Sequence, residues 1–163
     1  DNFESDKRFI ETVAELRVNK FWDLRICLLR ELGEISTKTN LTNLEKSTKE
    51  YFLSNINKSL ICYGVVNNND IISIASLCLF SRIPYQENLN GKEGYILNVF
   101  TSPEFRKKGL AKLLLQEIIR YANGHNIKKL WLNSSEYGKH LYSSLGFISK
   151  SNEMELILKT EIL

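Results

Sequence analysis

The segment Thr101–Ala111, TSPEFRKKGLA, combines a proline with three consecutive cationic residues and a glycine. The residues before it, Gly94–Phe100, alternate apolar side chains as a strand does. From the last two residues of this segment onward, the chain is apolar at positions 110, 111, 114, 115, 118 and 122, which is helical spacing. A loop between a strand and the start of a helix has unpaired backbone N–H groups and the positive end of the helix dipole. These features predict a site for an anion, most simply a phosphate.

The residue types of this basic loop, residues 106–111, fit phosphate binding. Arg106, Lys107 and Lys108 supply positive charge for a diphosphate and for a further phosphate. Gly109 has no Cβ, so a phosphate can approach the backbone amides, and the chain can adopt a conformation that other residues resist. A solvated surface turn is the alternative for these four residues in isolation. The strand before them and the amphipathic helix after them favour the anion site.

Two other phosphate-binding loops are excluded by the sequence. A nucleoside triphosphatase loop requires a second glycine and a Gly-Lys-Ser/Thr ending, whereas this loop ends Lys108-Gly109-Leu110. A dinucleotide-binding fingerprint requires three glycines. The pattern R-x-x-G-x-A from Arg106 to Ala111 instead resembles the acyl-coenzyme A loop of the GNAT superfamily of N-acyltransferases.

A second segment, SEYGKHLYSSLGF, extends this resemblance to the GNAT family. The family commonly has an asparagine, then a small residue, then Leu-Tyr and Gly-Phe. Here Ser135 replaces the asparagine, Gly138 is the small residue and Tyr142 follows. Ser135 is predicted to cap a helix that Gly146 ends. For Tyr142, the alternative to a role in the site is packing between a helix and a sheet.

The resemblance implies an α/β (α+β) fold, with a mixed, largely antiparallel sheet of six to seven strands flanked by about four helices. It also implies that residues 1–163 form one N-acetyltransferase domain, with acetyl-CoA as acyl donor and no metal. A primary amine would attack the thioester directly, and a small-molecule or amino-acid-type acceptor is favoured. The alternatives are a protein or peptide amine as acceptor, or a catalytically silent acyl-CoA-binding or sensor module.

The resemblance further implies roles for individual residues. The pantetheine arm would lie along the backbone of a strand, one N–H group would stabilise the oxyanion, and Tyr142 would protonate the departing thiolate. The residues assigned in this way to coenzyme binding are Val99, Phe100, Thr101, Arg106, Lys107, Lys108, Gly109, Leu110, Ala111, Ser135 and Gly138.

The acceptor side is less defined by the sequence. Asn98 cannot act as a base and is interpreted as positioning substrate or water, and Glu153 is a candidate ligand of the amine. Tyr85, in the loop Ser81–Glu93, is a candidate lid residue, and an ordinary connecting loop is the alternative. Glu104 is interpreted as solvated, so no general base is assigned.

The remaining elements are expected in an order that the resemblance also implies. The sequence predicts that Thr42-Asn43-Leu44-Glu45 forms a capping box at the start of a helix. The first expected elements are an edge strand over Lys7–Thr12 and a helix over Asn19–Leu32, with Phe21, Leu24, Leu28 and Leu32 on one face. A second helix from Thr42 to Ile56 and a hairpin of Ser59–Val66 and Ile71–Arg82 follow. The last expected elements are a strand over Lys128–Ser134 and final strands from Phe147 and over Glu153–Lys159.

Composition supports an ordered cytoplasmic protein. The longest nearly apolar run, Ile71–Phe80, is too short to span a bilayer, so no membrane association is expected. The net charge of +3 without an aromatic-interleaved basic stripe argues against nucleic acid as partner, which makes a basic interaction domain the least favoured function. The three cysteines have apolar neighbours and are expected to be reduced core thiols, and two histidines disfavour a metal site. A homodimer remains open.

Overall fold

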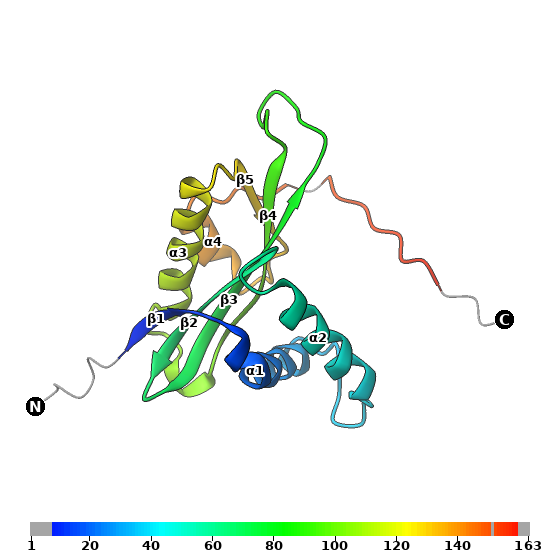
Figure 1. Ribbon diagram of the computed structural model, residues 1–163, viewed down its shortest axis with the longest axis vertical. Coiled ribbons are helices and arrows are strands. Elements are labelled where there is room, and N and C mark those ends of the chain that lie inside the picture. Colours follow the sequence, from blue (N-terminus) through cyan, green and yellow to red (C-terminus); the bar gives the residue numbers. More distant parts are fainter. Residues whose placement is uncertain (1–7, 151, 160–163) are drawn as a thin grey trace, which may run out of the picture. The chain divides into compact units, whose positions relative to one another are not determined.

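A computed structural model describes residues 8–150 and 152–159 of the chain. Within these residues the strands form one mixed sheet in which spatial order follows chain order (Figure 1). Adjacent strands are antiparallel except β4 and β5, which are parallel. The strands are β1 (Phe9–Thr12), β2 (Leu60–Asn67), β3 (Asp70–Ser81), β4 (Lys92–Thr101) and β5 (Lys129–Leu132).

Helices cover both faces of this sheet. Figure 1 shows α3 (Leu110–Gly124) on one side, and α1 (Val18–Glu31) and α2 (Thr42–Asn55) on the other. Short 3-10 turns over Glu15–Arg17 and Pro103–Phe105 precede α1 and the basic loop, respectively. None of the described helices has the length and apolar composition that crossing a bilayer requires. A further helix, α4 (Lys139–Ser144), belongs to a separate compact unit that begins at residue 134.

The main core lies between the sheet and the helices α1 and α2. Phe21 of α1 and Phe52 of α2 are buried, and their ring centroids are 4.6 Å apart. Burial of each such ring contributes about 1.5–3 kcal/mol to folding. Leu24 and Leu28 also pack in this core as the helical spacing predicts. Leu32 lies just beyond α1 and is 52% exposed, so its predicted place on this face is wrong.

The opposite face of the sheet is covered by the apolar stripe of α3. Leu114, Leu115 and Ile118 of this stripe are fully buried, which confirms the helical spacing found in the sequence. The central strand β3 is buried from Ile71 to Leu77 without alternation, because helices pack against both of its faces.

The predicted strands from Phe147 and over Glu153–Lys159 do not form in the described residues, so the sheet has five strands and not six to seven. Met154, Leu156, Ile157 and Leu158 give this segment the apolar composition of a strand, but all four are highly exposed. A strand needs a neighbour to pair its backbone groups, and no described residue pairs with this segment. Lys7, the predicted start of the first strand, lies outside the described residues.

The start of α2 is correct to the residue, but the predicted capping box is wrong. Thr42 is the first helical residue, and Leu41 occupies the N-cap without a side-chain hydrogen bond. The N–H of Thr42 donates instead to Asn40 Oδ1 at 3.0 Å. Asn40, which lies two residues before Thr42, therefore supplies the polar contact at this helix end.

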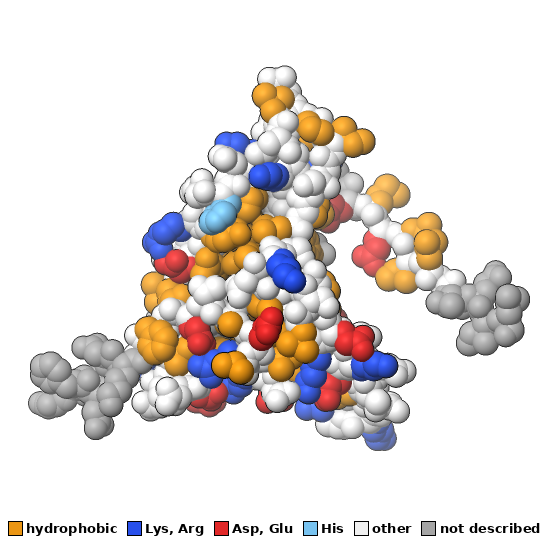
Figure 2. Space-filling view, viewed as in Figure 1, with side chains coloured by type: hydrophobic (Ala, Val, Ile, Leu, Met, Phe, Trp, Pro, Cys, Tyr) orange, Lys and Arg blue, Asp and Glu red, His pale blue; other side chains and the backbone are white. Residues whose placement is uncertain are grey.

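The connection between β3 and β4 is a long hairpin that extends past the helices (Figure 1). Apolar side chains are visible at its tip in Figure 2, and Ile83 and Leu89 are 87% and 71% exposed. Gly91 has φ +70°, and a Cβ there would collide with the carbonyl of Arg82. Only glycine therefore closes this hairpin without displacing the backbone.

Candidate functional site

The first element of the site is a β-bulge in β4. The antiparallel register between β3 and β4 shifts at Ala75, so that two residues of β4, Asn98 and Val99, lie opposite it. Asn98 has φ +55°, a left-handed conformation that asparagine adopts more readily than most residues. The bulge lies near the end of β4, ahead of the 3-10 turn that precedes the basic loop, and the Asn98 side chain is buried.

Beyond this bulge, β4 has an open edge. β5 pairs with β4 only from Glu93 to Ile96, and no described residue pairs with this edge of β4 farther along. On the other edge, the N–H of Ser102 donates to Ile72 of β3 at 2.8 Å. Because backbone groups alternate in direction along a strand, Phe100 also faces β3, whereas Val99 faces the open edge.

Thr101 also directs its backbone toward the open edge, but its carbonyl oxygen is already occupied. It accepts a hydrogen bond from Arg106 Nε at 2.8 Å. Of the three residues predicted to line an extended ligand through their backbone, Val99 therefore faces the open edge with both its N–H and its C=O, and no described residue pairs with that edge.

The basic loop has the backbone geometry of an anion site. Gly109 has φ +75° and directly precedes α3, and Lys107 has φ +62°. Within the described part of the chain, the backbone N–H groups of residues 107–112 have no acceptor. A Cβ on Gly109 would meet no atom within 4 Å, so the space in front of these amides is open.

The three cationic side chains of the loop differ in their surroundings. The Arg106 guanidinium lies 2.6 Å from Glu31 and 5.3 Å from the centroid of the Phe100 ring, so it ties the loop to α1 and β4. Lys107 and Lys108 are exposed and form no ion pair among the described residues. The uncompensated charge of the loop therefore comes from the two lysines.

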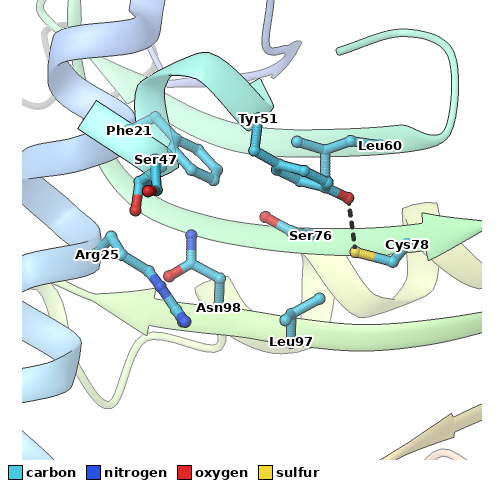
Figure 3. Close-up of a pocket in the computed structure, with 10 residues that line it drawn as sticks. Phe21, Arg25, Ser47, Tyr51, Leu60, Ser76, Cys78, Leu97 and Asn98 are labelled. Carbon is cyan, nitrogen blue, oxygen red and sulfur yellow. Dashed lines mark hydrogen bonds between the residues drawn. The ribbon is translucent and has the colours of Figure 1, made fainter. Parts of the chain in front are cut away.

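A pocket of about 220 Å³ lies between α1, α2 and the strands β3 and β4 (Figure 3). The guanidinium of Arg25 and the amide of Asn98 lie beside each other at one end, and Tyr51 and Cys78 lie at the other. The ten lining residues are Phe21, Arg25, Ser47, Thr48, Tyr51, Leu60, Ser76, Cys78, Leu97 and Asn98.

Asn98 is the most unusual polar group of this pocket. Its side chain is buried, with the residue only 5% exposed, and neither its Oδ1 nor its Nδ2 has a hydrogen-bond partner among the described residues. A buried amide without partners costs about 1–3 kcal/mol. Such a group is normally satisfied by a ligand or by water, which is consistent with its predicted role as a positioning residue.

At the other end of the pocket, the Tyr51 hydroxyl lies 3.3 Å from Cys78 Sγ. Burial and this hydrogen bond raise the pKa of Tyr51 to about 12, so the hydroxyl is protonated at neutral pH. All three cysteines are free, and Cys62 is buried as expected. Cys27, however, is exposed on α1, so its prediction as a core thiol is wrong, because its apolar sequence neighbours lie on a different face of the helix.

The sequence analysis missed most of the pocket lining, including Arg25, Ser47 and Tyr51. One signal was present: Arg25 follows Phe21 by one turn and lies inside the apolar stripe of α1. A charged residue in such a stripe indicates either an ion pair or a cavity. The contributions of Ser47 and Tyr51 depend on how α2 packs and have no comparable signal.

Tyr85 does not line the pocket. Its hydroxyl donates to Glu93 Oε2 at 2.6 Å, Asn88 Nδ2 donates to the same oxygen at 3.2 Å, and Arg82 lies 3.5 Å from the other oxygen. Burial alone would raise the pKa of Glu93, but the hydrogen bonds and nearby cations hold that pKa below its ordinary value. These contacts stabilise the β3–β4 hairpin and favour the interpretation of a connecting loop.

Residues 134–150 and 152–159 belong to the second compact unit, which contains Tyr142. Its helix α4 ends as predicted at Gly146, which has φ +98°. The N–H of Phe147 donates to the Tyr142 carbonyl at 3.1 Å, and the two rings pack with centroids 5.9 Å apart. This is a Schellman ending with its usual hydrophobic contact, so the Gly-Phe pair serves the helix end. Burial raises the pKa of Tyr142.

Ser135 and Gly138 lie in the turn before α4. Ser135 Oγ accepts the Gly138 N–H at 3.2 Å, but the N-cap of α4 is Gly138, so the prediction of Ser135 as the helix cap is wrong by one turn. A Cβ on Gly138 would lie 2.9 Å from Tyr142 Cε2, so this position accommodates the tyrosine ring. Glu153 is exposed in the segment 152–159.

Among the described residues, no group of three or more His, Cys, Asp and Glu side chains could hold a metal ion. Residues 28–147 match the model of the acetyltransferase (GNAT) family. No curated protein sequence matches the chain.

Solved structures with the same fold include three informative relatives. A predicted acetyltransferase with acetyl-CoA from Clostridium acetobutylicum is 26% identical, covers 92% of this chain and 96% of its own, and has a TM-score of 0.83. A GCN5-related N-acetyltransferase from Ralstonia eutropha JMP134 is 20% identical over 93% and 98% of the chains, with a TM-score of 0.82. Glucosamine-6-phosphate N-acetyltransferase from Arabidopsis thaliana is 17% identical over 94% and 100%, with a TM-score of 0.68.

Proposed function

Because the chain belongs to the GNAT acetyltransferase family, we propose that it transfers the acetyl group of acetyl-CoA to a primary amine of a small molecule by direct attack. Family membership makes it an acetyl-CoA-dependent acyltransferase. The acceptor, the direct attack and the roles of individual residues belong to the proposal. So do the single domain, the cytoplasmic location and the assembly as a homodimer.

The proposed coenzyme site joins the basic loop to the open edge of β4. The unpaired N–H groups of residues 107–112, with Lys107 and Lys108, would bind the phosphates. The pantetheine arm would pair with the backbone groups of Val99 at the open edge as an added strand does. Ser135 and Gly138, in the second unit, remain proposed contacts of the coenzyme.

A thermal unfolding experiment tests this coenzyme site. Coenzyme A at 100 times its dissociation constant should stabilise the folded protein by about 2.7 kcal/mol and raise the melting temperature. Magnesium-ATP should have a much smaller effect, since the loop lacks the Gly-Lys-Ser/Thr ending that binds a metal-triphosphate. Equal stabilisation by magnesium-ATP would contradict the assignment.

In the proposed reaction, the amine nitrogen forms a bond to the acetyl carbon and the carbon–sulfur bond breaks. The proton that the amine loses balances the proton that the coenzyme thiolate gains. The Val99 N–H would stabilise the oxyanion, because it faces the open edge directly after Asn98, which lines the pocket. Tyr142 would donate a proton to the thiolate and recover one from solvent, and its raised pKa keeps its hydroxyl protonated at neutral pH.

The proposal of an amine acceptor rests on strand β4, which contributes both to the pocket and to the open edge. Leu97 and Asn98 line the pocket with their side chains, while the next residue, Val99, presents its backbone to the open edge. An amine in the pocket and a thioester on the edge would therefore meet at adjacent residues of one strand. The ten lining residues include no carboxylate or imidazole, so no general base is assigned.

A screen of primary amines with acetyl-CoA, following the release of free thiol, tests the reaction. The panel should contain amino acids, amino sugars, polyamines and a peptide with a free N-terminus, with reactions lacking protein or amine as controls. Amine-dependent thiol release is the expected result. Tight coenzyme binding without turnover of any amine would favour the silent acyl-CoA-binding module instead.

A further inference from the structure

We infer that the acceptor is an α-amino acid, whose carboxylate is bound by Arg25 at one end of the pocket. This inference rests on the proposed function and narrows its substrate class. Arg25 is half-buried on α1, lines the pocket, and has no ion-pair or hydrogen-bond partner among residues 8–150 and 152–159. By contrast, Arg17 and Arg106 are each paired with a glutamate. A half-buried cation without an anion favours an anionic ligand.

Asn98 supplies independent evidence for a polar ligand at this end. Its buried amide has no hydrogen-bond partner in the described part of the chain and lies beside the Arg25 guanidinium in Figure 3. Together the two side chains offer a planar fork of N–H donors and an amide that can both donate and accept. That donor set matches a carboxylate, which accepts two parallel hydrogen bonds from a guanidinium.

The charge of the pocket favours an amine that carries a carboxylate over amines that carry other charged groups. Arg25 is the single ionised residue among the ten that line the pocket, so it can balance a monoanion but leaves a phosphate dianion half-compensated. A polyamine or an aminoglycoside would bring further positive charge toward Arg25 and would find no carboxylate there. The lining therefore selects an amine with one negative charge.

The size and apolar surface of the pocket favour a compact acceptor. Its volume of about 220 Å³ is below the roughly 300–1,000 Å³ of pockets for drug-sized ligands. Phe21, Leu60 and Leu97 supply an apolar wall for a side chain. Because Asn98 lies beside Arg25 and directly precedes Val99, the carboxylate and the reacting amine must be close together, as they are in an α-amino acid.

The test compares matched amines on the parent protein. Each apolar L-amino acid is assayed with its amide and with its decarboxylated amine, for example L-leucine, leucinamide and 3-methylbutylamine, with acetyl-CoA and thiol detection. We expect kcat/KM for at least one amino acid to exceed that of both matched amines by about tenfold or more. The amino group of the amide is less basic than that of the amino acid, so a larger fraction of it is deprotonated and reactive. This difference alone would favour the amide, which is the opposite of the expected result.

Variants then assign the effect to Arg25. Arg25→Gln should lower kcat/KM for the amino acid by about 10- to 100-fold, mainly through KM, and should leave the decarboxylated amine nearly unchanged. Arg25→Lys keeps the charge but loses the planar fork of N–H donors, so its kcat/KM for the amino acid should lie between those of the parent and of Arg25→Gln. Arg30→Gln removes the same charge from an exposed site on the same helix and is the matched control. The coenzyme-induced shift in melting temperature verifies that each variant is folded.

Three results would overturn the inference while leaving the proposed function intact. They are equal turnover of amino acids and decarboxylated amines, an equal loss for both in Arg25→Gln, and a preference for glucosamine-6-phosphate or spermidine over every amino acid. Failure of the parent protein to acetylate any amine, despite coenzyme binding, would instead contradict the proposed function itself.

Discussion

Arg106 Nη2 lies 2.6 Å from Glu31 Oε2, in an ion pair that joins the basic loop to the end of α1 across 75 residues of sequence. Arg106 also donates to the Thr101 carbonyl, so two anchors hold its side chain. A residue expected to bind phosphate is thus paired with a carboxylate of the protein. Glu31 consequently places a negative charge beside the proposed anion site.

Glu31→Gln should therefore strengthen coenzyme A binding. Both partners of the pair are partly exposed, so the gain should be small, about two- to fivefold in Kd, and should disappear at high salt. Calorimetric titration at two ionic strengths measures it, and Glu34→Gln, an exposed neighbour beyond α1, serves as control. Weaker binding in Glu31→Gln would show that Glu31 instead holds Arg106 in its binding position.

Gly109→Asp should abolish coenzyme A binding, because it places an anion at the open space before the amides of α3. Gly109→Ala is the matched variant. It carries a left-handed strain of about 1–2 kcal/mol, at least as large as that of aspartate, and no charge. Titration should show near-parent affinity for the alanine variant and none for the aspartate variant. An equal loss in both would mean that the backbone conformation alone accounts for the effect.

Tyr142→Phe should lower turnover about 100-fold while acetyl-CoA binding stays near the parent value, since the ring and its contact with Phe147 remain. Because burial raises the pKa of Tyr142, the parent should lose activity only in the alkaline range above the ordinary tyrosine value of about 10, and the variant should lack this limb. Steady-state kinetics across pH measures both effects. Tyr137→Phe, at a fully exposed tyrosine of the same unit, is the control. Unchanged turnover in Tyr142→Phe would leave Tyr142 as a packing residue.

Tyr85→Phe should destabilise the protein at neutral pH, because it removes a hydrogen bond to the buried Glu93 carboxylate. A lowered folded-state pKa means that this stabilisation is present above the unfolded pKa of about 4.3 and is lost as pH falls through the folded value. The difference between parent and variant should thus shrink in acid.

Urea unfolding at a series of pH values, from neutral down to about pH 3, checks this expectation. Tyr95→Phe is the control, because the Tyr95 hydroxyl has no hydrogen bond among the described residues. A difference that is independent of pH would show that the Tyr85 hydroxyl does not stabilise the charged form of Glu93.

Local patterns predicted the elements whose signals come from neighbouring residues. The stripe of α3, the start of α2 and the glycine that ends α4 were all readable, because helical spacing and left-handed glycines are properties of short segments. The prediction of a strand over Glu153–Lys159 relied on the same kind of local pattern and was wrong. The apolar composition of this segment permits a strand, but a strand forms only against a partner, and composition does not specify that partner.

The sequence by itself determined the basic loop, its place between a strand and a helix, and the family, because these depend on residue types at fixed short spacings. Only the tertiary structure decided the rest of the candidate site. The bulge at Asn98 depends on its register with β3, the partner of Arg106 lies on α1, and the pocket places Arg25 beside Asn98 from elements far apart in the chain. Contacts of this kind arise from packing between elements, and no local pattern encodes which side chains packing will bring together.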